Sequence, residues 1–130
     1  MSVVLDAGAL ISIDRNERLV MSMLKRAFEL DVPVVTSAGA VGQVWRGGAR
    51  QASLARALRG IRIHELDARS ARDIGHLLAV SESSDVIDAH VAIIARASDL
   101  VVTSDVDDIS HLMSCAGVHA DIIRPSEVLD

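Results

Sequence analysis

The sequence contains few aromatic residues, one cysteine and one lysine. With one Trp, one Phe and no Tyr among 130 residues, it cannot form the platform of several rings on which some modules stack nucleic-acid bases. The single cysteine, Cys115, excludes an internal disulfide and a zinc site built from several thiolates. Lys25 is the only lysine, so mechanisms that depend on a lysine side chain are nearly excluded. The low cysteine content leads us to expect a cytoplasmic protein in a reducing compartment.

Long apolar runs are also absent. None approaches the ~20 residues that a membrane span needs, and Asp6 lies where a signal peptide would be apolar. Half of the residues are hydrophobic and 24% are charged, which gives enough apolar surface to order a compact chain. The length fits one core of ordinary size. We expect a single domain over residues 1–130, outside the membrane, with a net charge of -5.

Short β-branched runs alternate with longer helical patterns along the chain. The runs are at 3–5, 32–35, 61–63, 100–102 and 122–123. Helical patterns cover 17–30, 37–46, 49–59, 68–80, 86–97 and 106–115, and the pattern at 86–97 is apolar on nearly every side. Strands this short and apolar are typical of a parallel sheet covered on both faces. The pattern predicts a three-layer α/β/α fold with a central, mainly parallel sheet of about five strands.

Aspartates follow several of these strands, at the edge where open α/β sheets bind ligands. Asp6 follows the first run, Asp105 follows the fourth, and Asp88 lies at the start of the buried helix; Asp85 and Asp108 are three residues from Asp88 and Asp105. Carboxylates ~4 Å apart repel by ~4 kcal/mol at an effective dielectric constant of about 20, so their convergence requires a cation. Oxygen ligands select Mg²⁺ or Mn²⁺, and no histidine spacing indicates zinc.

The same aspartates also fit a purely structural interpretation. Asp85 and Asp88, like Asp105 and Asp108, have the spacing of a helix cap followed by an acid in the first turn. Capping explains each pair taken alone. The metal-site hypothesis rests on three strand ends that carry an acid at the same predicted edge.

The ordered motifs resemble those of the PIN-domain family. They are Leu5-Asp6-Ala7-Gly8, Thr36-Ser37-Ala38, Asp88-Ala89-His90-Val91-Ala92 and Val102-Thr103-Ser104-Asp105, in this order over almost the whole chain. The likeness is greatest to the small VapC-type toxins of bacterial toxin–antitoxin modules. This resemblance implies an Mg²⁺- or Mn²⁺-dependent endoribonuclease that a partner antitoxin restrains.

The resemblance also assigns residues to the site. It places catalytic, metal-binding acids at Asp6, Asp88 and Asp105, and a glutamate of the family's pattern falls on Gln43. Glutamine keeps one acceptor oxygen and loses a full charge, which should weaken a metal position. Asp85 and Asp108 are candidate metal ligands in its place.

Other polar residues have candidate supporting roles. Thr103 and Ser104 either orient a carboxylate or metal-bound water or cap a helix, and Ser37 most simply caps one. Five arginines and no acid lie between positions 46 and 64; Arg46 and Arg50 are the candidate RNA ligands. The alternative is a solvated helix face.

Three residues are interpreted as structural. Trp45 is assigned to the core or to a subunit interface, His90 to a structural role, and the two glycines at 39 and 42 to close helix packing.

The leading hypothesis is a metal-dependent ribonuclease with an RNA substrate, a cognate antitoxin and a homodimeric state. The alternative is a weak or silent PIN-like module that binds RNA or a protein partner, which Gln43 suggests. A phospho-acceptor receiver domain fits poorly because it needs a lysine after a late strand, and Lys25 lies in an early helix.

Overall fold

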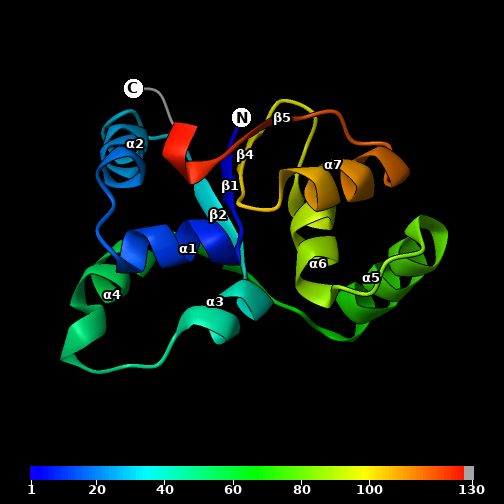
Figure 1. The fold of residues 1–130 in the computed structure, drawn as a ribbon, viewed down its shortest axis with the longest axis horizontal. Helices are drawn as coiled ribbons and strands as arrows, with labels where there is room; N and C mark the ends of the chain where they lie inside the picture. Colours follow the sequence, from blue (N-terminus) through cyan, green and yellow to red (C-terminus); the bar gives the residue numbers. More distant parts are fainter. Residues whose placement is uncertain (128–130) are drawn as a thin grey trace.

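A five-stranded sheet forms the centre of the computed structural model, which describes residues 1–127 (Figure 1). Its strands are β1 (Val3–Leu5), β2 (Val34–Ser37), β3 (Arg62–His64), β4 (Leu100–Val102) and β5 (Asp121–Ile123), in the order β3-β2-β1-β4-β5. Every pair is parallel. Because β1 lies between β2 and β4, the chain reverses its winding direction next to β1, and this is where such sheets bind ligands.

Helices cover both faces of the sheet (Figure 1). One layer holds α1 (Ala7–Asp14), α2 (Arg18–Glu29), α3 (Ala38–Val44) and α4 (Ala52–Leu58); the other holds α5 (Ala68–Ser81), α6 (Val86–Ile94) and α7 (Val106–Cys115). Short 3-10 turns, η1 (Ala49–Gln51) and η2 (Pro125–Glu127), complete the described chain. The expected three-layer α/β/α fold with a parallel sheet of five strands is confirmed.

Alternating residues of β1 divide the core between the two layers. Val3 and Leu5 pack with the helices of one face, whereas Val4 packs with those of the other. All three side chains are at most 4% exposed. Burial on both faces accounts for the continuous apolar strand, in place of alternation between apolar and polar residues.

Some elements differ from the sequence prediction. Helix α1 was not expected: it is short, and its first turn follows directly on the strand through Asp6. Strand β2 begins two residues later than predicted, after Pro33, which has no amide hydrogen to donate to a sheet. The pattern at 86–97 ends as a helix at Ile94, and its first residue, Val86, is 46% exposed. No helix within residues 1–127 has the length and apolarity to cross a lipid bilayer.

Candidate metal centre

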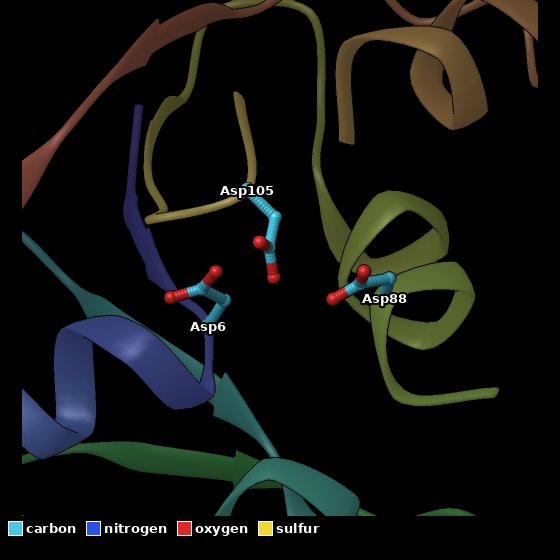
Figure 2. A group of neighbouring side chains, drawn as sticks. All are labelled: Asp6, Asp88 and Asp105. Atoms are coloured by element: carbon cyan, nitrogen blue, oxygen red, sulfur yellow. The ribbon is translucent and has the colours of Figure 1, made fainter. Parts of the chain in front are cut away.

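Three aspartates meet at the carboxyl edge of the sheet (Figure 2). Asp6 directly follows β1, Asp105 follows β4 and begins α7, and Asp88 lies in the first turn of α6. One carboxylate oxygen from each lies within 4.8 Å of those of the other two. Figure 2 shows the three side chains pointing into a common space. The three aspartates therefore converge at one edge of the sheet, as the sequence predicts.

Asp6 caps a helix and also belongs to the cluster. Its Oδ1 accepts a hydrogen bond of 2.8 Å from the amide of Ala9, and its Oδ2 accepts one from the hydroxyl of Thr103. Asp6 is 1% exposed. Burial raises the pKa of its carboxyl, with a further contribution from Asp105, and the two hydrogen bonds partly oppose the rise. The capping and metal-site interpretations are thus compatible at this position.

Thr103 connects two of the three acids. While its hydroxyl donates to Asp6, its Oγ1 accepts a hydrogen bond of 2.9 Å from the amide of Asp105. Thr103 is fully buried, so this orientation is protected from water. The hydroxyl therefore fixes the carboxylate of Asp6 and the start of α7 relative to each other.

Asp88 is the least compensated acid of the cluster. It is 7% exposed, and its carboxylate accepts no hydrogen bond from any described residue. Burial raises its pKa to about 7, with repulsion from Asp85, Asp105, Asp6 and Asp108 adding to the shift. A buried carboxylate without a donor among other acids is costly to ionise unless a cation lies nearby.

Asp85 and Asp108 flank the cluster on one side. Asp85 is the N-cap of α6, and its Oδ1 accepts a hydrogen bond of 2.9 Å from the amide of Asp88. Both flanking acids line a hollow of about 240 Å³ with Asp88; its other walls are Ser83, Ser84 and Leu112. Larger hollows of about 370 and 480 Å³ lie between α2 and α4 and beside α5, but neither is lined by several carboxylates. The flanking acids therefore extend the negative field beyond the three-acid cluster.

A glycine allows two segments of the site to approach each other. A Cβ placed on Gly8, in the first turn of α1, would overlap Oγ of Ser104 and lie 2.8 Å from its Cβ. Since Ser104 stands between Thr103 and Asp105, any side chain at position 8 would displace the segment that carries both. Sequence reasoning assigned no role to Gly8, because the contact is with a residue distant in the chain.

Helix α3 is attached to α6 beside Asp88. A hydrogen bond of 2.6 Å joins Oγ of Ser37 to Nδ1 of His90, and Oγ also accepts from the amide of Gly39 at 3.0 Å. A Cβ on Gly39 would lie 3.1 Å from Cγ1 of Ile87. Burial, and the proximity of His64, lower the pKa of His90. The structural role of His90, the cap at Ser37 and close packing at Gly39 are confirmed.

The prediction of close packing at Gly42 is wrong. Gly42 is exposed, and no atom outside its own helix lies within 4 Å of the position of a Cβ there. Gln43, the next residue, is also exposed, and it hydrogen-bonds to no acid of the described chain. The side of the cluster near α3 therefore gains no charge from position 43.

The residues after α3 lie on the surface. Arg46 and Arg50 are exposed, and neither forms an ion pair within residues 1–127. The guanidinium of Arg46 donates to the carbonyl of Trp45 at 2.6 Å. Trp45 is 41% exposed, so it does not lie in the core, and its alternative assignment to a subunit interface stays a prediction.

The ligand atoms of the cluster fit a hard divalent cation. All of them are carboxylate oxygens, and no histidine or cysteine joins the group among the described residues. A ligand set made only of carboxylate oxygens favours Mg²⁺ or Mn²⁺ over zinc. The carboxylate of Asp88, which accepts no hydrogen bond from the described chain, fits the same interpretation, because a cation would supply the partner that it lacks.

The fold is similar to that of solved structures, one of which matches nearly the whole chain. In the structure of FitAB bound to an IR36 DNA fragment, a chain matches with a TM-score of 0.63 and 17% sequence identity, over 98% of this chain and 98% of that one. No protein-family model and no curated protein matches the sequence. At this identity the match shows a shared fold, and it agrees with the PIN-like α/β/α architecture of the sheet and its helices.

Proposed function

We propose that this protein is an Mg²⁺- or Mn²⁺-dependent endoribonuclease that hydrolyses RNA phosphodiester bonds. The observation that carries the proposal is the convergence of Asp6, Asp88 and Asp105 within 4.8 Å at the carboxyl edge of the sheet. Asp85 and Asp108, which line the adjoining hollow, are the candidate assisting ligands.

The chain's own groups have distinct parts in this chemistry. A divalent cation bound by the acids would activate water and stabilise the leaving oxygen of a phosphodiester. Thr103 holds Asp6 in a fixed orientation through its hydroxyl. Asp88, whose carboxylate accepts no hydrogen bond from the described chain, would hold the cation together with Asp6 and Asp105.

We further propose that the protein is the cytoplasmic toxin of a toxin–antitoxin module, with a cognate antitoxin and a homodimeric state. The ordered motifs that resemble VapC-type toxins support this, as does the fold shared with a chain of the FitAB–DNA structure. Arg46 and Arg50 are the proposed RNA contacts, because both are exposed and without an acidic partner in the described chain.

A second candidate is a weak or silent PIN-like module that binds RNA or a protein. Gln43 favours it, because an exposed amide stands where the family's pattern has a glutamate. The loss of one carboxylate lowers the affinity of a cation site that depends on ligand charge.

Metal-dependent cleavage separates the two candidates. Wild type and Asp88→Asn are assayed on single-stranded RNA with Mn²⁺ and with a chelator, and Mn²⁺ binding is followed by calorimetry. Asp73→Asn, which changes an exposed acid on α5, is the matched control. We expect cleavage by wild type and by the control only with Mn²⁺, and none by Asp88→Asn. Mn²⁺ binding without cleavage, or neither of the two, would favour the silent module.

A further inference from the structure

Trp45 is an exposed ring at the end of a helix that starts beside the acids. It is the C-cap of α3, and its side chain is 41% exposed. Helix α3 begins after Ser37, the last residue of β2, so about 10 Å of helix separates the carboxyl edge of the sheet from the ring. The only other aromatic residue is Phe28, on α2.

The backbone under this ring is held by a buried glutamine. Oε1 of Gln51 accepts hydrogen bonds from the amides of Arg46 at 2.7 Å and Gly47 at 2.9 Å, while its Nε2 donates to the carbonyl of Val44 at 3.0 Å. Gln51 is 6% exposed. Because these bonds fix the residues on both sides of Trp45, the ring loses little backbone entropy when a ligand covers it.

An arginine adjoins the ring. A Cβ on Gly47 would lie 3.8 Å from the indole Nε1, and the guanidinium of Arg46 donates to the Trp45 carbonyl. Between positions 46 and 64 the chain has five arginines and no acid. None of these arginines forms an ion pair with a described acid. The surface therefore combines an aromatic face with uncompensated charge, as single-strand binding grooves do.

We propose that Trp45 stacks on a base of single-stranded RNA while Arg46 and Arg50 contact the flanking phosphates. That the ligand is RNA rests on the proposed function. That the surface recognises a base next to phosphates rests on the exposed ring and the neighbouring arginines. A second copy of the chain fits this surface poorly, because a two-fold contact would bring the same arginines against one another.

The sole tryptophan makes the proposal directly measurable. Since the chain has no other Trp and no Tyr, its fluorescence under excitation of tryptophan reports on Trp45. Asp88→Asn protein with Mg²⁺ is titrated with an RNA of about eight nucleotides, within the site sizes of about 4–16 nucleotides typical of such grooves. DNA of the same sequence, an RNA duplex and inorganic polyphosphate are the comparison ligands. We expect saturable quenching by the single-stranded RNA and none by polyphosphate, which has charge but no bases.

Binding measured by filter retention tests the energetic contribution. Trp45→Ala should weaken RNA binding by about 5- to 150-fold, the range of one lost stacking contact, and Trp45→Phe should restore most of it. Phe28→Leu, which removes the other ring, should bind like the parent protein. Unchanged emission with RNA, equal quenching by polyphosphate, stronger binding of DNA, or emission that changes only with protein concentration would overturn the proposal. Wild-type cleavage is measured separately, so a failure of the nuclease assignment is distinguishable from a failure of stacking.

Discussion

Gly8 lies so close to Ser104 that Oγ of Ser104 occupies the place that a Cβ on residue 8 would need. The contact joins the first turn of α1 to the segment between β4 and α7. Asp6 and Asp105 lie two residues before Gly8 and one residue after Ser104. The separation of these two acids is therefore set by a steric fit as well as by the Thr103 hydroxyl.

Gly8→Ala should weaken Mn²⁺ binding by about 10- to 100-fold, the usual effect of disturbing the residues that orient metal ligands. Adding Ser104→Gly removes the two closest of the three atoms that the new Cβ would meet and leaves only Oδ1 of Asp6, at 3.3 Å, so the double variant should recover most of the affinity. Calorimetric titration measures both effects. Gly75→Ala is the control, because a Cβ there meets no atom within 4 Å. No recovery in the double variant would mean that the contact does not position Asp105.

The stability of the metal-free protein should fall as the pH rises from about 4 to about 7. The pKa of Asp88 is raised from 3.8 to about 7 in the folded state, so in this interval the folded chain holds a proton that the unfolded chain has released. Its contribution to the free energy of unfolding is complete below pH 3.8 and is lost as the pH passes 7. Urea unfolding with a chelator, at pH 5 and at pH 7.5, measures the change.

Asp88→Asn should remove much of this pH dependence and make the metal-free protein more stable than wild type at pH 7.5. Asparagine occupies the same space without charge, which ends the repulsion from the neighbouring acids. Mn²⁺ should stabilise wild type at pH 7.5 and have little effect on Asp88→Asn. If the two proteins unfold alike at both pH values, Asp88 does not have the raised pKa.

Gln43→Glu should tighten Mn²⁺ binding and raise the rate of cleavage if position 43 faces the cation. The substitution adds one negative charge without changing the shape of the side chain. Because the residue is exposed, its effect on the free energy of unfolding should be within about 0.5 kcal/mol. Calorimetry and an RNA cleavage assay check the two expectations, with Asp88→Asn inactive in both backgrounds. An unchanged Mn²⁺ affinity would exclude position 43 from the metal site.

Replacing Arg46 and Arg50 by Ala should lower the salt dependence of RNA binding. Two phosphate contacts fewer should reduce the slope of log affinity against log salt by about 1.4, because fewer counterions are released. Arg69 and Arg72, exposed on α5, are the matched control pair. Filter binding at several salt concentrations gives the slopes. Equal slopes for both double variants and wild type would indicate a solvated face.

The three acids could be predicted because they depend on local patterns. Each follows a short apolar strand or begins a helix, and parallel strands bring their carboxyl ends to one edge. From these patterns the sequence predicts that Asp6, Asp88 and Asp105 share a neighbourhood, and their oxygens do lie within 4.8 Å. Their catalytic role stays a prediction.

Other features depend on contacts between distant segments, and local patterns do not report these. Gly8 matters because of Ser104, and the exposure of Trp45 follows from the loop that Gln51 holds. Helix α1 was missed because it is short, although Asp6 at its N-cap was a usable signal. Tertiary context overrides local preference most easily in such short elements.

The hydrogen bond from Thr103 to Asp6 joins residues 97 positions apart. Contacts of such long sequence separation form late, since a large loop must close first. During synthesis from the N-terminus, β1 has no β4 beside it until residue 102 has emerged. A ribosome-bound chain that ends before this strand has the first acid but not its partner, so the three-acid cluster can assemble only when most of the polypeptide has been made.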